Sequence, residues 1–102
     1  MTTAEFKEQT KGKAAIVYFS AKWCSMCRFF SPRFDVWAER YKDKDIVWLK
    51  VDVDESANMA IDFHVEEVPM IVAVTIDGGI IFKGLKDNIN EKKIKELVGD
   101  PS

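Results

Sequence analysis

The feature that most constrains the fold is a helical stripe of aromatic residues between two strand-like runs. Phe30, Phe34, Trp37 and Tyr41 recur at the period of an amphipathic helix, which predicts a helix over about residues 24–41. Residues 14–20 before it and 46–53 after it are apolar and rich in β-formers. A strand, a crossover helix and a second strand form a right-handed parallel pair. The first half of the chain therefore predicts a βαβ unit.

The second half predicts an antiparallel hairpin and a final helix. The apolar residues 70–76 lead through Asp77-Gly78-Gly79, a strong turn signal, into the strand-like residues 80–83. Ile94, Leu97 and Val98 form a short helical stripe. We expect that helix to begin with a capping box of Asn88 and Glu91 and to end at Gly99. Shorter helices are expected at about 4–11 and 56–62. This order predicts an α/β fold with a mixed four-stranded sheet.

Size and composition limit the functional classes. The 102 residues, 47% of them apolar, suffice for one packed core, so we expect residues 1–102 to form a single domain. No apolar run approaches the roughly 18–20 residues that span a membrane. The polar N-terminus lacks the pattern of a secretory signal, which favours a cytoplasmic protein without a membrane partner. The net charge of −2 gives no reason to expect nucleic acid as a partner.

The charge is distributed unevenly. The first 50 residues carry a net charge of +4 and the remainder −6. Six acidic residues follow one another with no basic residue between them: Asp52, Asp54, Glu55, Asp62, Glu66 and Glu67. Such a run usually forms a solvated face, and the alternative is a patch that selects a basic partner.

The two cysteines, Cys24 and Cys27, lie too close together to join distant parts of a fold. They stand where the first strand ends and the long helix begins. Free N–H groups and the helix dipole stabilise a thiolate there, so we expect a lowered pKa for Cys24 and a more shielded Cys27. Their spacing brings the Cα atoms to about 5–6 Å, within disulfide range. The pair therefore predicts thiol–disulfide exchange, in which one cysteine attacks and the other resolves the mixed disulfide.

A zinc site is the main chemical alternative for a C-x-x-C pair. Zinc takes four ligands, and the single histidine, His64, lies far along the chain without a partner. We therefore expect no metal, no cofactor other than the Cys24–Cys27 disulfide, and a helix-end or surface position for His64.

Several motifs together resemble the thioredoxin family from about residue 14 to the end. They are Trp23-Cys24-Ser25-Met26-Cys27-Arg28, Pro32 after it, Lys50-Val51-Asp52-Val53-Asp54, Val68-Pro69 and Gly84. The run Tyr18-Phe19-Ser20-Ala21 with Cys27-Arg28 is more similar to tryparedoxins and nucleoredoxins. The resemblance implies a thioredoxin-like three-layer α/β/α sandwich. The chain lacks the first strand of typical thioredoxins, which leaves a four-stranded sheet.

The resemblance also implies roles for particular residues. Cys24 would be the exposed nucleophile and Cys27 the resolving thiol. Pro69 would be cis and face the pair, and the Val68 backbone would bind an extended substrate segment. The remaining substrate contacts would be Trp23, Met26 and Gly84, although Trp23 could instead be a core aromatic and Gly84 a plain turn residue. The implied activity is reduction of protein disulfides by a monomer, with electrons from an upstream reductase or a low-molecular-weight thiol.

Two departures from the family pattern bear on the chemistry. Ser25-Met26 replaces the usual Gly-Pro between the cysteines, and we expect a less reducing potential as a result. Tyr18 occupies the place of a buried carboxylate, the proton acceptor for the second cysteine, and a phenol with a pKa of about 10 is a poor base. We expect Lys50, Tyr18 or a water to take that proton.

Two other functions stay open at this point. A disulfide oxidase or isomerase is disfavoured by the absence of a secretory signal. A thioredoxin-like binding module, in which redox activity is incidental, is possible because a fold does not fix a function.

Overall fold

The computed structural model describes residues 1–85 and 88–99. Along the chain lie α1 (Thr3–Gln9), β1 (Ala14–Ser20), α2 (Ser25–Arg40), β2 (Ile46–Asp52), α3 (Ala57–Asp62), β3 (Met70–Val74), β4 (Ile80–Leu85) and α4 (Glu91–Val98). The predicted order of helices and strands is confirmed. A short 3-10 helix, Lys42–Lys44, between α2 and β2 was not predicted.

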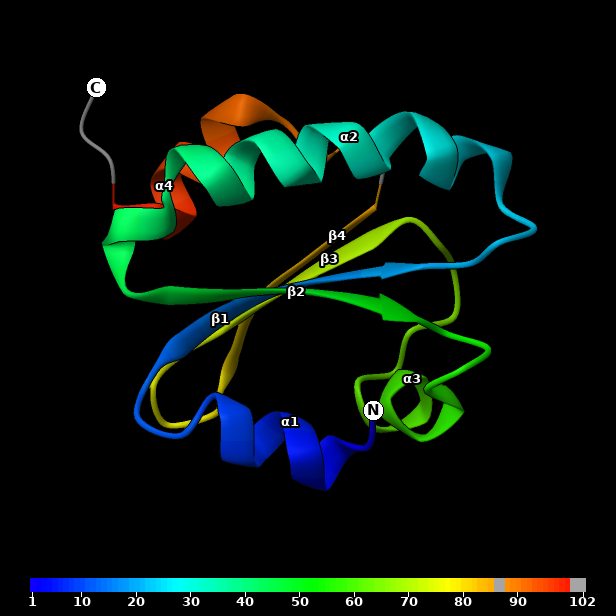
Figure 1. The fold of residues 1–102 in the computed structure, drawn as a ribbon, viewed down its shortest axis with the longest axis horizontal. Coiled ribbons are helices and arrows are strands. Elements are labelled where there is room, and N and C mark those ends of the chain that lie inside the picture. The colour runs from blue at the N-terminus through cyan, green and yellow to red at the C-terminus, as the bar shows by residue number, and fades with distance from the viewer. Residues whose placement is uncertain (86–87, 100–102) are drawn as a thin grey trace.

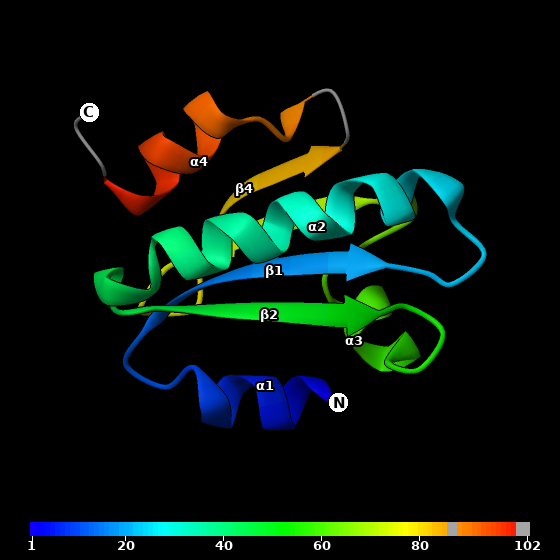
Figure 2. The ribbon, with the colours of Figure 1, turned by 45° about the horizontal axis from the view of Figure 1, so that its top comes forward.

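The four strands form one mixed sheet in the order β2-β1-β3-β4. Figure 2 shows β2 beside β1, and β4 on the other side of β1. β1 pairs with β2 in parallel and with β3 antiparallel, and β4 closes the hairpin antiparallel to β3. The helices α2 and α4 cover one face of the sheet, and α1 and α3 cover the other (Figure 1). The predicted three-layer α/β/α sandwich with a four-stranded mixed sheet is therefore confirmed.

Strand β1 explains why the first apolar run is nearly continuous. Its side chains alternate between the two faces of the sheet, as in any strand. Ile16 and Tyr18 pack in the core beneath α2 and α4. Ala15, Val17 and Phe19 pack in the core toward α1 and α3. Both faces are covered, so every position between Ala15 and Phe19 is apolar or aromatic and buried.

The C-terminal end of α4 agrees with the sequence, and its N-terminal cap does not. Gly99 ends α4 with φ 75°, as predicted for a glycine cap. The expected capping box at Asn88 is wrong, because Asn90 is the N-cap and its side-chain oxygen accepts the N–H of Lys93 at 2.9 Å. His64 follows α3, is exposed and has φ 54°, which confirms the expected helix-end position.

Candidate active site: the cysteine pair and its groove

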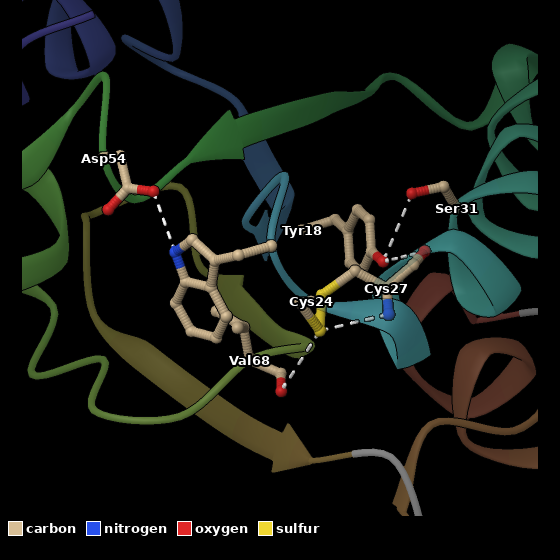
Figure 3. Close-up of a disulfide and its surroundings, with 7 residues drawn as sticks. Tyr18, Cys24, Cys27, Ser31, Asp54 and Val68 are labelled. Carbon is tan, nitrogen blue, oxygen red and sulfur yellow. Dashed lines mark hydrogen bonds between the residues drawn. A yellow bond between two sulfur atoms is a disulfide. The ribbon is translucent and has the colours of Figure 1, made fainter.

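The cysteine pair lies where the chain passes from β1 into α2. Cys24 is the N-cap of α2 and Cys27 lies in its first turn, with the Cα atoms 5.3 Å apart and the sulfurs joined in a disulfide (Figure 3). The backbone N–H of Cys27 donates to Cys24 Sγ at 3.1 Å. This N–H belongs to the free donors of a helix N-terminus, which stabilise negative charge. In the reduced protein the same donor favours the thiolate of Cys24.

Cys24 is more covered than the sequence led us to expect, whereas Cys27 is shielded as expected. Cys24 is 7% exposed and Cys27 3% exposed, so the expectation of an exposed Cys24 is corrected to a mostly buried sulfur. The physical reason is packing: the two cysteines and Ala21 form a small cluster against the partly buried Val53 and Val68. Cys24 remains the more accessible of the two.

The Val68–Pro69 peptide is cis, which confirms the expectation for Pro69. It lies immediately before β3, and the carbonyl oxygen of Val68 is 3.8 Å from Cys24 Sγ (Figure 3). The start of β3 therefore brings a backbone carbonyl beside the sulfur that a substrate must reach.

A groove of about 550 Å³ runs past this peptide. Its lining residues are Trp23, Met26, Glu66, Glu67, Val68, Pro69 and Leu85. Trp23 is 71% exposed, which rules out the alternative of a core aromatic. Its indole N–H donates to Asp54 Oδ2 at 2.9 Å, the dashed contact to Asp54 in Figure 3. The structure therefore brings together four of the expected substrate contacts: Trp23, Met26, Val68 and Pro69.

Gly84 lies in a strand, which contradicts the alternative of a plain turn residue, and its contact with substrate stays a prediction. It lies inside β4 opposite Ile71, is buried, and is absent from the residues that line the groove. A Cβ at this position would meet the Phe82 ring, so a larger residue would require that ring to move. The neighbouring Leu85 lines the groove instead. Sequence reasoning missed Leu85, whose only signal is its place at the end of the last strand.

Tyr18 contacts the backbone of the second cysteine. Its hydroxyl donates to the carbonyl oxygen of Cys27 at 3.0 Å and accepts from Ser31 Oγ at 3.3 Å (Figure 3). Burial raises the pKa of Tyr18 above its usual 10.0, and the bond from Ser31 only partly opposes this. The phenol is therefore neutral near pH 7, where it joins β1 to the first turn of α2. It cannot accept a proton there.

Lys50 is engaged elsewhere. It lies opposite Tyr18 in the β1–β2 register, but its ammonium group binds the carboxylate of Asp35 on α2 at 3.0 and 3.3 Å. The pair is largely solvent-exposed. Of the two proton-transfer candidates, the structure brings Tyr18 to the backbone of Cys27 and directs Lys50 to a surface ion pair.

A second cavity of about 310 Å³ reaches Cys27 from outside the groove. It is lined by Ser20, Ala21, Lys22, Cys27, Arg28, Ser31 and Asp52. Ser31 and Asp52 were not singled out by sequence reasoning for a role here. Their signal is visible only in the fold, which brings the ends of β1 and β2 to the first turns of α2.

The described residues show no metal or membrane-spanning features. Within residues 1–85 and 88–99, no three His, Cys, Asp or Glu side chains are grouped closely enough to hold a metal ion. In the same part of the chain, no helix is long and apolar enough to cross a bilayer.

Comparison with known proteins places these features in a family. The thioredoxin family model matches residues 1–99. Thioredoxin H5 of Arabidopsis thaliana is 38% identical over 86 residues, which cover 81% of this chain and 70% of that protein. Mitochondrial thioredoxin of Mus musculus is 33% identical over 87 residues, which cover 82% of this chain and 51% of that protein. The chain therefore spans about half the length of this mitochondrial relative.

Solved structures show the same fold. Fasciola hepatica thioredoxin superposes with a TM-score of 0.79 at 26% identity, over 99% of this chain and 95% of that one. Oxidised mitochondrial thioredoxin 3 of Saccharomyces cerevisiae superposes with a TM-score of 0.79 at 27% identity, over 97% of this chain and 90% of that one. A third chain superposes with a TM-score of 0.77 at 26% identity, over 95% of this chain and 88% of that one. It comes from a study of the thiol resolving mechanism in a yeast mitochondrial 1-Cys peroxiredoxin via glutathione and thioredoxin systems.

Proposed function

Because this chain belongs to the thioredoxin family, we propose that it reduces disulfides of other proteins through Cys24 and Cys27. It is a thiol–disulfide oxidoreductase of the thioredoxin type. The observation that carries the proposal is the Cys24–Cys27 disulfide at the N-terminus of α2, beside the cis Val68–Pro69 peptide. A helix start, two cysteines one turn apart and an adjacent backbone carbonyl supply what dithiol–disulfide exchange requires.

The reaction needs no group besides the two cysteines. The thiolate of Cys24 attacks one sulfur of the substrate disulfide, which forms a mixed disulfide and releases one substrate thiolate. Cys27 then loses its proton and attacks the sulfur of Cys24. The Cys24–Cys27 disulfide forms and the second substrate thiolate leaves, so two electrons pass from the protein to the substrate. An upstream reductase or a low-molecular-weight thiol returns the two electrons.

Cys24 and Cys27 take different roles because their surroundings differ. Cys24 is the nucleophile, because the N–H of Cys27 points to its sulfur and it is the more accessible of the two. Trp23, Met26, Val68 and Pro69 bind the substrate segment in the groove, and Leu85 takes the place expected for Gly84. The proton of Cys27 passes to water in the small cavity that Cys27 lines, since Tyr18 is held neutral and Lys50 is bound to Asp35.

The proposal extends to partners, organisation and location. Protein disulfides as substrates, and a reductase or a small thiol as donor, agree with the peroxiredoxin study of a structurally similar chain. We further propose that residues 1–102 form one domain, that the protein acts as a monomer and that it resides in the cytoplasm. Mitochondrial proteins are among its relatives, so cell fractionation is the test of the compartment.

A redox titration tests the activity. The protein is equilibrated in glutathione buffers, and the state of Cys24 and Cys27 is read by thiol alkylation and mass. We expect a reversible two-electron transition more reducing than the glutathione pool, which lies at about −220 to −260 mV by extraction. A midpoint more oxidising than the pool would indicate an oxidase or isomerase instead. The absence of a reversible disulfide would indicate a binding module.

A further inference from the structure

The groove beside the cysteine pair carries negative charge next to its substrate-binding backbone. Glu66 and Glu67 line it and directly precede Val68 in the chain. Both side chains are exposed, and neither forms an ion pair with a residue in the described ranges 1–85 and 88–99. Other carboxylates nearby are engaged: Glu55 pairs with Lys22 at 3.3 Å, and Asp54 accepts the indole N–H of Trp23.

The ammonium group of Lys83 is not paired with Glu66 or Glu67. Lys83, on β4, donates from its ammonium group to the backbone carbonyls of Phe63 and His64 at 2.8 and 3.0 Å. Arg28 lines the small cavity at Cys27 and not the groove. Among the residues that the structure describes, the two glutamates therefore give the groove a negative potential that a substrate meets beside Val68.

The remaining walls of the groove are apolar. Trp23 and Met26 are 71% and 40% exposed, and Leu85 completes the wall at the end of β4. An extended segment in this groove meets an apolar surface at the cysteine and carboxylates beside Val68. The chemistry that complements this arrangement is a peptide with a basic side chain close to its cysteine.

We propose that the groove selects protein disulfides in which a lysine or arginine lies within about two residues of the attacked cysteine. This inference rests on the proposed function and adds its substrate class. Glu67 and Glu66 stand one and two positions before Val68. If the substrate backbone pairs with Val68, each step along an extended segment advances by about 3.3 Å, so side chains one or two residues from the cysteine lie opposite the glutamates. A neutral or acidic segment gains nothing there, and an acidic one is repelled.

The test compares peptides that differ only in the flanking residue. Three peptide disulfides of one sequence carry lysine, glutamine or glutamate beside the cysteine, and the rate constant for oxidation of the reduced protein is measured by quenched alkylation. We expect the lysine peptide to react about threefold to tenfold faster than the glutamine peptide, and the glutamate peptide to react slowest. In 0.5 M salt the differences shrink, because exposed charges are screened.

Two double variants locate the effect. Glu66→Gln with Glu67→Gln should reduce the lysine-to-glutamine ratio of rate constants to less than about twofold, and a change in rate common to all three peptides cancels in that ratio. Asp43→Asn with Asp77→Asn removes the same charge from exposed positions outside the groove and should keep the original ratio. A ratio near one in the unmodified protein, or equal ratios in the two double variants, would overturn the inference. If even the glutamine peptide is not reduced, the proposed function itself fails, and the inference with it.

Discussion

The two sides of the Cys24–Cys27 disulfide differ in exposure, in charge and in how closely they follow the family pattern. On the Cys24 side lie an exposed tryptophan, a cis-proline and an open acidic groove. On the Cys27 side lie a fully buried tyrosine, a serine and a small cavity. The first side keeps Trp23 and the cis Val68–Pro69 peptide of the family pattern, although Ser25-Met26 replaces the usual Gly-Pro. The second replaces the expected buried carboxylate with Tyr18. Under the proposed function, the first side binds and attacks the substrate, and the replacement at Tyr18 bears on the resolving step at the second.

Tyr18 also changes what the buried side contributes to stability. Its ring stacks on Phe34 with centroids 5.2 Å apart, and its hydroxyl is satisfied by two hydrogen bonds. A charged carboxylate in the same place would cost free energy by losing its hydration, whereas a bonded phenol costs little. The Cys27 side therefore gains packing and loses the base of the family pattern, and the acceptor that we propose for the Cys27 proton is water in the adjacent cavity.

The largest expected effect comes from exchanging the two cysteines for serine one at a time. Both variants should lose turnover by about a thousandfold or more, because each removes one half of the exchange. They should differ in what accumulates. Cys27→Ser retains the nucleophile and should collect a mixed disulfide with substrate, seen as added mass under non-reducing conditions, whereas Cys24→Ser should not. The reverse pattern would show that the roles of the two sides are exchanged.

Tyr18→Phe tests the buried side by stability. It removes the bond to the Cys27 carbonyl and should lower the free energy of unfolding by about 1–2 kcal/mol in denaturant titrations. The variant should still resolve mixed disulfides at nearly the parent rate, since the neutral phenol is not the proton acceptor. Ser31→Ala, which removes only the bond to Tyr18, is the matched control with a smaller loss. A large drop in the resolving rate of Tyr18→Phe alone would contradict this assignment.

The raised pKa of Tyr18 predicts that the stability of the parent and of Tyr18→Phe depends differently on pH. Burial favours the neutral phenol, so the pKa of Tyr18 is higher in the folded protein than in the unfolded chain. The contribution of neutral Tyr18 to the free energy of unfolding is fully present below the unfolded pKa of about 10. It is lost as pH rises through the higher folded pKa. Above about pH 10, the parent should therefore lose more stability than Tyr18→Phe. Parallel losses in the two proteins would show that Tyr18 ionises as freely when folded as when unfolded.

Most of the fold could be predicted from the sequence, because the periodicity of side chains depends on local backbone geometry. The aromatic stripe of α2, the hairpin at Gly78 and the glycine cap at Gly99 are all of this kind. The N-cap of α4 was predicted at Asn88 and lies at Asn90. Two asparagines near one helix start offer equivalent side chains, so the sequence does not distinguish them. The cis peptide at Pro69 was predictable only through the family resemblance.

The parts of the site that sequence did not predict depend on contacts between distant segments. Gly84 was assigned to the groove, but its Cβ position faces the Phe82 ring and Leu85 lines the groove. Lys50 was a candidate acceptor for the Cys27 proton, and only the placement of α2 over the sheet shows that Asp35 binds its ammonium group. The direction of a long side chain is decided by such tertiary neighbours, which local sequence does not specify.

On the Cys24 side, a smaller effect is expected from the bond between Trp23 and Asp54. Trp23→Phe keeps an aromatic surface in the groove and removes the 2.9 Å bond to the carboxylate, so the substrate should bind less well by about 0.5–1.5 kcal/mol. Asp54→Asn retains an acceptor and should have less effect. The measurement is the rate constant for reaction with a peptide disulfide. A larger loss in Asp54→Asn than in Trp23→Phe would indicate that the charge of Asp54, and not the bond, is what the groove requires.

The smallest expected effect is that of Lys50→Met. This variant tests the Cys27 side, because a large effect would show that Lys50 takes part in the resolving step. The ion pair of Lys50 with Asp35 is exposed, and such pairs contribute about 0–1 kcal/mol, so stability should change by less than about 1 kcal/mol. The rate at which Cys27 resolves a preformed mixed disulfide should stay within about twofold of the parent. Lys42→Met, which breaks the exposed pair with Glu39, is the matched control. A tenfold slowing in Lys50→Met alone would mean that the ammonium group leaves Asp35 during the reaction and serves Cys27. The buried side would then use a side chain and not water for the proton.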